Sequence, residues 1–295
     1  MSLATIFPGQ GSQFVGMARE LAEENPRVRE RFDEADSILG YSLSDIMFSG
    51  PEEKLTQTSY TQPAIFLHSV ALHETLELTP DMTGGHSLGE FSAIVAAGAV
   101  SFSTGLELVA LRGSLMQQAG EVDPGTMAAI IGMEDGQVEK LCSEASELTG
   151  KPVVLANYNS PGQLVISGDL DAVEKAVEMA REQGCRLAKV LQVSGAFHSP
   201  LMKTAYEGLK EKLESVEFNK PDVPVYSNVT AEPAVDPVVL RENLLKQLLE
   251  PVRWTESLQN MKKDGANRFI EVGPGKVLQG LVKRTLKDVE FTGYQ

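Results

Sequence analysis

Cysteine is scarce in this chain of 295 residues, which contains only Cys142 and Cys185. Two isolated cysteines without metal-ligand spacing build neither a disulfide framework nor a zinc site, and they favour a reducing compartment. No stretch approaches about 18 uninterrupted apolar residues, so no membrane-spanning helix is expected. The first residues lack a basic region followed by a long apolar one, so no signal peptide is expected either. We therefore expect a cytoplasmic protein.

Basic residues are also few, since 26 Lys and Arg face 41 Asp and Glu, for a net charge of −15. Nucleic-acid binding needs basic surface and is not expected. Residues 251–295 are the exception, with eight basic and five acidic residues, a net of +3. The basic cluster there is either a set of solvated helix faces or a docking surface for an acidic partner. Its members are Lys262, Lys263, Arg268, Lys283, Arg284 and Lys287. A second candidate docking surface lies around Arg186 and Lys189.

The order of apolar patterns predicts an α/β protein with an insertion. Residues 126–194 alternate between short apolar runs and amphipathic stretches in the order β-α-β-β-α-β, a ferredoxin-like pattern. The expected strands and helices cover 126–131, 134–148, 153–158, 163–167, 171–183 and 186–193. We therefore predict a large subdomain of residues 1–125 and 195–295, and a small ferredoxin-like subdomain of residues 126–194.

Residues 85–89 read Gly-His-Ser-Leu-Gly, which is the G-x-S-x-G spacing of a nucleophile elbow. In such an elbow the serine lies on a turn between a strand and a helix, and the glycines relieve crowding around it. An apolar helix is expected to follow, from Leu88 to the stop at Gly98. By itself the motif is equally consistent with a serine nucleophile and with a chance match. A base, an oxyanion donor and a substrate anchor would decide for the nucleophile.

Arg112 is a candidate anchor because it lies within a segment, 106–115, that is apolar nearly all round and so predicts a buried helix. A buried guanidinium needs an anionic partner. That partner is either a protein carboxylate or a substrate carboxylate held by the planar fork of the arginine. The residues alone leave both possibilities open.

His198 is the histidine best placed to act as a base, because it lies in a loop just before the helix that Ser199 and Pro200 can start. His68 and His73 lie five residues apart, off one helical face, and we expect both to be structural. His86 adjoins the serine, but neighbours at a sharp turn point in different directions. A further helix is expected over 243–250, ending before a proline.

Two glycine loops do not have nucleotide-binding spacing. After Gly9 and Gly11 the next glycine is Gly16, which is too late for the dinucleotide fingerprint. Residues 273–276 read Gly-Pro-Gly-Lys and lack the spacing of a phosphate-binding loop. We expect no bound cofactor and no metal.

Five stretches occurring in order carry a resemblance that covers essentially the whole chain. They are 7–13 (Phe-Pro-Gly-Gln-Gly-Ser-Gln), 85–90 (Gly-His-Ser-Leu-Gly-Glu), 111–113 (Leu-Arg-Gly), 195–199 (Gly-Ala-Phe-His-Ser) and 271–275 (Glu-Val-Gly-Pro-Gly). Together they resemble the malonyl-CoA:acyl carrier protein transacylases of bacterial fatty-acid synthesis and the related polyketide acyltransferases. The resemblance implies an α/β-hydrolase-like core with an inserted ferredoxin-like subdomain. It also implies an acyltransferase whose substrates are malonyl-CoA and phosphopantetheinylated acyl carrier protein.

The resemblance also assigns roles to residues. Ser87 would form the acyl-enzyme and His198 would take its proton. The backbone N–H groups of Gln10 and Leu88 would form the oxyanion hole, and Arg112 would hold the malonyl carboxylate. In this family a main-chain carbonyl orients the histidine. The matching position here is Gln247, and Asn157 is assigned to the cleft lining.

Two positions bear on the acyl group. Phe197 before the histidine and Leu88 after the serine are the residues that malonyl-selective members tend to carry. Excluding one methyl group is worth only about 1–3 kcal/mol, so a graded preference is expected. We expect a ping-pong transferase that acts as a monomer. The sequence leaves open whether it supplies fatty-acid or polyketide synthesis. The alternatives are an acyl-hydrolase and a non-catalytic module that binds the carrier protein.

Overall fold

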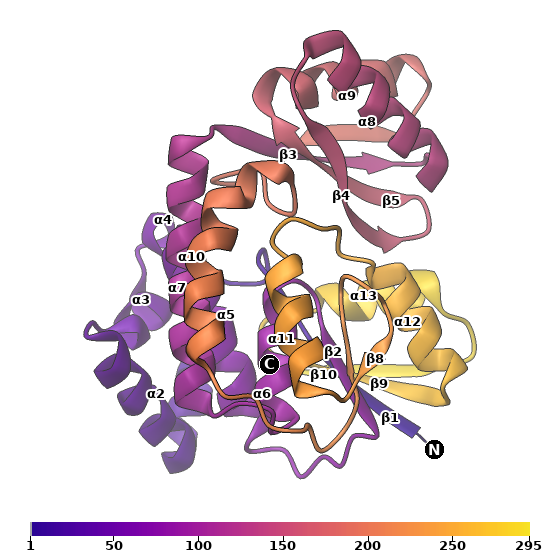
Figure 1. Cartoon of the computed structure of the whole chain (residues 1–295). Coiled ribbons are helices and arrows are strands. Elements are labelled where there is room, and N and C mark those ends of the chain that lie inside the picture. The colour runs from indigo at the N-terminus through magenta and orange to yellow at the C-terminus, as the bar shows by residue number, and fades with distance from the viewer. Residues whose placement is uncertain (1) are drawn as a thin grey trace.

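The computed structural model describes residues 2–295 and contains two separate β-sheets (Figure 1). The larger sheet has six strands in the order β10-β9-β1-β2-β7-β8. All neighbours in it are parallel except β7 and β8. The strands are β1 (Ser2–Phe7), β2 (Met82–Gly85), β7 (Val225–Tyr226), β8 (Pro233–Ala234), β9 (Ala266–Val272) and β10 (Glu290–Tyr294). Because β1, β2 and β9 are parallel, the loops after their carboxyl ends meet at one edge.

Helices cover both faces of this sheet, as the alternation of side chains along β1 requires. Ala4 and Ile6 pack in a cluster with residues of α12 and α13, whereas Phe7 packs in the larger cluster with α2, α5, α6 and α7. The helices of this part are α1 (Arg19–Glu24), α2 (Pro26–Leu39), α3 (Leu43–Ser49), α4 (Glu52–Leu55), α5 (Thr58–His73), α6 (Leu88–Ala96), α7 (Phe102–Val122), α10 (Lys203–Ser215), α11 (Pro237–Lys246), α12 (Trp254–Lys263) and α13 (Val277–Thr285), with a 3₁₀ turn at Pro200–Met202.

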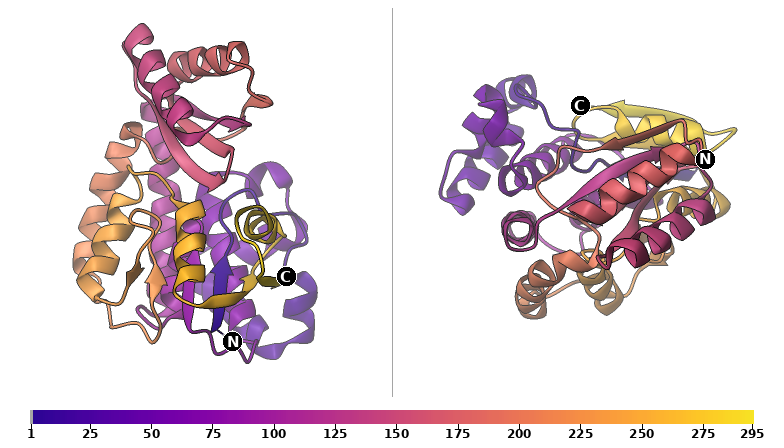
Figure 2. Two further views of the ribbon diagram at one scale, coloured as in Figure 1. Left: turned by 90° about the vertical axis from the view of Figure 1, so that its right-hand side faces the viewer. Right: turned by 90° about the horizontal axis from the view of Figure 1, so that it is seen from above.

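The smaller sheet is antiparallel, with the order β4-β5-β3-β6. Its elements follow the predicted order: β3 (Gly125–Ile131), α8 (Asp135–Thr149), β4 (Val153–Ser160), β5 (Gln163–Asp169), α9 (Leu170–Glu182) and β6 (Leu187–Val190). It has its own apolar cluster with α8 and α9. Figure 2 shows this unit at one end of the molecule, beyond the larger sheet. The last strand is shorter than predicted because the chain leaves the sheet after Val190.

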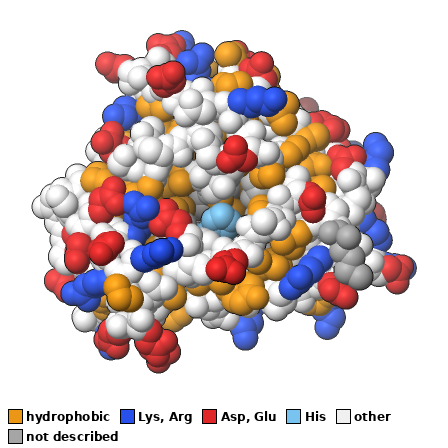
Figure 3. Space-filling model, turned by 90° about the horizontal axis from the view of Figure 1, so that it is seen from below, with side chains coloured by type: hydrophobic (Ala, Val, Ile, Leu, Met, Phe, Trp, Pro, Cys, Tyr) orange, Lys and Arg blue, Asp and Glu red, His pale blue; other side chains and the backbone are white. Residues whose placement is uncertain are grey.

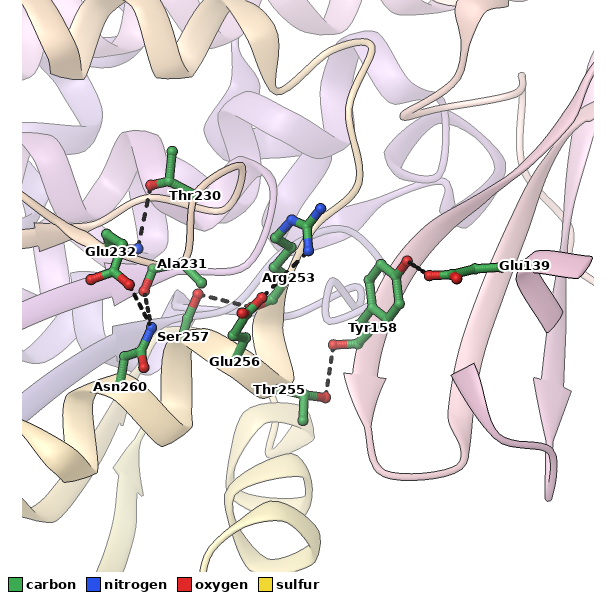
Figure 4. A network of polar contacts seen from close by, with 10 residues as sticks. All are labelled: Glu139, Tyr158, Thr230, Ala231, Glu232, Arg253, Thr255, Glu256, Ser257 and Asn260. Atoms are coloured by element: carbon green, nitrogen blue, oxygen red, sulfur yellow. Dashed lines mark hydrogen bonds and ion pairs between the residues drawn. The ribbon is translucent and has the colours of Figure 1, made fainter. Parts of the chain in front are cut away.

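The smaller sheet is tied to the start of α12 and to the chain just before it, and Figure 4 shows the contacts of Thr255 and Tyr158. Val252 forms a parallel bridge with β4: its N–H donates to Ala156 O at 2.8 Å, and its carbonyl accepts from Tyr158 N at 2.9 Å. The Thr255 hydroxyl also donates to Tyr158 O, at 3.0 Å, and the Tyr158 hydroxyl donates to Glu139 on α8 at 2.6 Å. Residues 252–255 therefore fix β4 to the larger part of the molecule.

The helix predicted over 243–250 was misplaced. The actual helix, α11, starts at Pro237, where Asp236 caps it by accepting from the N–H groups of Val238 and Val239. It ends at Lys246, four residues earlier than predicted. Pro251 explains the end, because it has no N–H to donate to the carbonyl of Gln247 four residues before it.

The basic cluster lies at the amino end of β9, whereas the loops after β1 and β2 lie at the carboxyl ends. Lys262 and Lys263 end α12 just before β9, and the Lys262 ammonium donates to the carbonyl of Lys287. Figure 3 shows the end of the molecule opposite the smaller sheet, where basic side chains are mixed with acidic and apolar ones. This placement favours solvated helix faces over the docking surface that the charge count allowed.

Within residues 2–295, no helix combines the length and apolar character needed to cross a membrane.

Candidate active site

Ser87 lies on the turn between β2 and α6, as the motif predicted. Its backbone has φ 52° and ψ −106°, a conformation that residues other than glycine rarely adopt. The two motif glycines make the turn possible. A Cβ on Gly85 would lie 1.9 Å from the carbonyl carbon of Gly89, and a Cβ on Gly89 would lie 2.0 Å from the carbonyl oxygen of Phe7. The strained turn therefore presents the hydroxyl at the carboxyl edge of the sheet.

His198 approaches Ser87 from the loop before Pro200, with its Nε2 atom 2.8 Å from the serine Oγ. Its Nδ1 atom lies 2.7 Å from the carbonyl oxygen of Gln247. A carbonyl only accepts, so Nδ1 carries the ring proton and Nε2 presents a lone pair to the serine hydroxyl. Burial, and then the charge of Arg112, lower the pKa of His198 to about 3. The ring is therefore neutral at pH 7 and can accept the serine proton.

The carbonyl that orients His198 is free because of the local sequence. In a continuing helix it would accept from the residue four positions later, which here is Pro251. A proline at that position leaves the carbonyl of Gln247 without a helical donor, and the imidazole takes that place. The position that the resemblance pointed to is thus explained by the proline that ends the helix.

Arg112 is 1% exposed on α7 and reaches Ser87 directly. Its Nη2 atom donates to Ser87 Oγ at 3.1 Å and to Gln247 Oε1 at 2.9 Å, and its Nη1 atom donates to Gln62 Oε1 at 2.7 Å. All three acceptors are neutral. The ion pair with a protein carboxylate, which the sequence left open, is not made by Arg112 within residues 2–295. Burial lowers the pKa of Arg112 to about 10, so it is protonated at pH 7.

A cavity of about 190 Å³ opens onto these groups. It brings together the residues predicted for the site, except Gln247, which lies behind Ser87 and His198. The predicted residues that line it are Gln10, Ser87, Leu88, Arg112, Asn157, Phe197 and His198. Leu191 and Val193, from the chain that leaves β6, also line it.

Two backbone N–H groups at this cavity are available for an oxyanion. In residues 2–295 neither the N–H of Gln10 nor that of Leu88 donates to a protein acceptor. Leu88 is the first residue of α6, where N–H groups have no intrahelical partner and the helix dipole favours negative charge. The side chain of Gln10 donates to Thr58 Oγ1 at 3.3 Å, which anchors the loop after β1.

The sequence did not identify the polar residues behind the site. Asn228 clamps the elbow: its Oδ1 accepts from Ser87 N at 2.6 Å and its Nδ2 donates to Gly85 O at 2.7 Å. Gln62 holds Arg112, and Glu90 holds Gln247 at 2.6 Å. The amides lie far from their partners in the sequence and carry no periodic signal. Glu90 did carry one, because a lone acidic residue in a buried apolar helix needs a partner just as Arg112 does.

His86 has a different role from His198. Its Nε2 atom pairs with Asn159 Oδ1 on β4 at 2.7 Å, and its ring lies edge-on to that of Trp254, with the ring centroids 5.7 Å apart. Burial lowers its pKa. It therefore links the elbow to the smaller sheet, while His198 faces the serine. Among the described residues 2–295, no group of three or more His, Cys, Asp or Glu is arranged to hold a metal ion.

The sequence matches known acyltransferases over nearly its whole length. A family model described as the acyl transferase domain matches residues 5–293. The chain is 47% identical over 285 residues to the malonyl CoA-acyl carrier protein transacylase of Bacillus subtilis, covering 96% of this chain and 90% of that protein. The Escherichia coli protein of the same name is 45% identical over 285 residues, covering 95% and 92%.

Solved structures agree with these relatives. An acyl carrier protein S-malonyltransferase from Vibrio cholerae is similar with a TM-score of 0.96 and 45% identity, covering 100% of this chain and 97% of that one. A malonyl-transacylase in complex with a type II PKS acyl-carrier protein has a TM-score of 0.95 and 40% identity, covering 100% and 96%. The chain therefore belongs to the acyl transferase family, among the malonyl CoA-acyl carrier protein transacylases.

Proposed function

We propose that this chain transfers the malonyl group from malonyl-CoA to the phosphopantetheine thiol of acyl carrier protein, through a malonyl ester on Ser87. The observation that carries the proposal is the guanidinium of Arg112. Its Nη2 atom lies 3.1 Å from Ser87 Oγ, and within the described residues 2–295 its hydrogen-bond partners are all neutral. A buried cation beside a nucleophile suits an acyl group that ends in a carboxylate. Relatives at 45–47% identity bear the name of this activity.

In the first half-reaction Ser87 Oγ attacks the thioester carbonyl carbon, and His198 Nε2 takes the hydroxyl proton. The carbonyl oxygen becomes negative and is stabilised by the N–H groups of Gln10 and Leu88. The carbon–sulfur bond then breaks, and the proton passes from Nε2 to the departing CoA sulfur. The product is a malonyl ester on Ser87 with neutral His198, which is ready to act again.

The second half-reaction reverses these steps with a different thiol. His198 Nε2 takes the proton of the phosphopantetheine thiol, whose sulfur attacks the ester carbonyl, and the proton returns to Ser87 Oγ when the ester breaks. Arg112 holds the malonyl carboxylate throughout, which fixes the carbonyl against the oxyanion donors. The proposed reaction needs only protein groups and the two substrates, with no cofactor or metal.

The arrangement of the two sheets supports the division predicted from the sequence. We assign residues 1–125 and 195–295 to an α/β-hydrolase-like catalytic subdomain, because its parallel sheet carries the serine on a strand-turn-helix elbow. Residues 126–194 form the inserted ferredoxin-like subdomain, whose four strands run β4-β5-β3-β6. Asn157 and Phe197 close the cavity at the junction of the two. With Leu88, Phe197 provides the steric basis for a graded preference for malonyl over methylmalonyl groups.

Acyl carrier protein is proposed to dock beside β6. Arg186 and Lys189 are exposed there, and two residues after Lys189 the chain reaches Leu191 at the cavity. A docked carrier protein could extend its arm from that rim to Ser87. The basic cluster at the amino end of β9 offers no such route.

The experiment that tests the proposal measures CoA release and malonyl transfer from malonyl-CoA with and without phosphopantetheinylated acyl carrier protein. A transferase releases about one equivalent of CoA alone and turns over only when the carrier protein is added. Continuous CoA release without the carrier protein would indicate an acyl-hydrolase. Carrier-protein binding without any CoA release would indicate a non-catalytic module.

A further inference from the structure

Glu90 is a buried carboxylate directly behind the reacting groups. It lies in the first turn of α6, three residues after Ser87, and is 0% exposed. Its Oε2 atom accepts from Gln247 Nε2 at 2.6 Å and from the backbone N–H of Asn228 at 3.1 Å. Both partners also hold the elbow, since Gln247 Nε2 donates to Ser87 O at 3.0 Å and Asn228 Oδ1 accepts from Ser87 N.

The amide of Gln247 separates two opposite charges. Its Nε2 atom faces Glu90, and its Oε1 atom accepts from Arg112 Nη2 at 2.9 Å. An ionised carboxylate only accepts, so Glu90 fixes which end of the amide faces it, and the carbonyl end must face the guanidinium. Burying a guanidinium away from water without an anion nearby costs free energy. Glu90 is the carboxylate whose charge acts on Arg112, although the two side chains do not touch.

The separation has a consequence for the substrate. A carboxylate in direct contact would neutralise the guanidinium and occupy the donors that a substrate carboxylate needs. A carboxylate one side chain away supports the cation without a direct ion pair, and Arg112 still lines the cavity. The same carboxylate also repels a second anion that arrives at Arg112, so it moderates how tightly the anion is held.

Glu90 can gain or lose its proton near neutral pH. Burial raises its pKa to about 7, against the hydrogen bonds from Gln247 and Asn228, which lower it. Arg112 on α7, with a pKa of about 10, is the charged group that acts on it. His198, with a pKa of about 3, lies against the backbone carbonyl of Gln247. His86 beside the elbow has a lowered pKa.

We propose that Glu90 is the counter-charge of Arg112, held one side chain away by Gln247, and that it sets the strength with which the site binds a carboxylated acyl group. It is a positioning residue, because it acts through Gln247 and Arg112. The inference rests on the proposed function, since it concerns the acyl group that Arg112 holds.

The test compares binding of malonyl-CoA and acetyl-CoA by calorimetry at pH 8.5, in a Ser87→Ala background that prevents turnover. Glu90→Gln keeps the shape of the side chain. Its amide oxygen can accept from Gln247 and Asn228, and its NH₂ group can donate to the Ser227 hydroxyl. We expect the dissociation constant of malonyl-CoA to fall by about tenfold while that of acetyl-CoA stays within twofold, because one buried negative charge is removed near the substrate carboxylate. The variant should also unfold at a lower temperature without ligand.

Glu271→Gln is the matched control. Glu271 is also 0% exposed, but it accepts from Leu278 N and Gln279 N at the start of α13, away from the cavity. It should lower thermal stability and leave both dissociation constants unchanged. Unchanged or weakened malonyl-CoA binding in Glu90→Gln would overturn the inference. If the Ser87→Ala protein with Glu90 intact did not prefer malonyl-CoA to acetyl-CoA, the proposed function would fail instead.

Discussion

Two arginines of this protein, Arg112 and Arg31, each lie over an aromatic ring but have different polar partners. Arg31 lies over the ring of Phe102 at 4.5 Å, and Arg112 lies over the ring of Phe91 at 5.4 Å. Arg31 is 27% exposed and bonds two carboxylates: Glu34, and Glu74 at 2.8 and 2.9 Å. Arg112 is buried and, among residues 2–295, bonds only neutral oxygens.

The difference separates a structural cation from one kept open for a ligand. The charge of Arg31 is satisfied within the protein, and water screens what remains. The charge of Arg112 is balanced only at a distance, and its Nη2 atom donates to the serine hydroxyl. Substitutions at either arginine or its partners can remove this contrast or increase it.

The largest effect is expected from Arg112→Ala. Truncating one partner of a buried charge pair costs about 2–5 kcal/mol, so kcat/KM for malonyl transfer should fall at least about thirtyfold. Transfer of acetyl, which has no carboxylate, should fall less than about tenfold. Steady-state assays with both CoA esters measure the two losses. Equal losses would make Arg112 a structural residue like Arg31.

Gln62→Glu should make Arg112 resemble Arg31. The new carboxylate replaces a neutral oxygen that lies 2.7 Å from Arg112 Nη1, so it pairs with the guanidinium directly. We expect KM for malonyl-CoA to rise by about tenfold, with acetyl transfer changed by less than about threefold. Kinetics with the two esters provide the test, and malonyl selectivity that survives the substitution would contradict the account of Arg112.

The pH dependence should follow Glu90. Its pKa is raised to about 7, so the carboxyl is neutral below that pH and negative above it. The negative form repels the substrate carboxylate, and malonyl-CoA affinity relative to acetyl-CoA should therefore decrease about severalfold from pH 6 to pH 8.5. The ratio cancels titration of the CoA moiety. Calorimetric titrations across this range should give a flat ratio in Glu90→Gln, and a slope that persists there would exclude Glu90 as its source.

Arg31→Ala should have the smallest effect. Its ion pairs are partly exposed, and such pairs contribute about 0.2–1 kcal/mol each to the free energy of unfolding. Denaturant unfolding should show a loss of about 1–2 kcal/mol, which includes the lost contact with Phe102. Malonyl and acetyl transfer should both stay within twofold of the unsubstituted protein. A selective loss of malonyl transfer would show that the contrast between the two arginines is not electrostatic.

Local sequence patterns predicted the parts of the site that depend on neighbouring residues. The spacing around Ser87 predicted its strand-turn-helix setting, and the position of His198 before Pro200 predicted a loop at the rim. The apolar run around Arg112 predicted its burial. Alternating patterns predicted the element order of the smaller sheet, with boundaries off by a few residues. These features are local because turn sterics and periodic burial act over a few residues.

Long-range polar contacts could not be predicted in the same way. Asn228 lies 141 residues from Ser87 in the chain, and its place beside the elbow depends on β7 pairing with β2. Gln247 acts on His198 through a backbone carbonyl, which no side-chain pattern reveals, and only the resemblance pointed to it. The basic cluster shows the reverse case: residues that the sequence groups by charge lie at the end of the sheet opposite Ser87.

The most direct test of the central claim is intact-protein mass spectrometry after mixing with malonyl-CoA in the absence of carrier protein. The account predicts a single malonyl adduct that disappears when acyl carrier protein is added, and no adduct in Ser87→Ala. A malonyl adduct of equal occupancy in Ser87→Ala would contradict it, because another residue would then carry the acyl group.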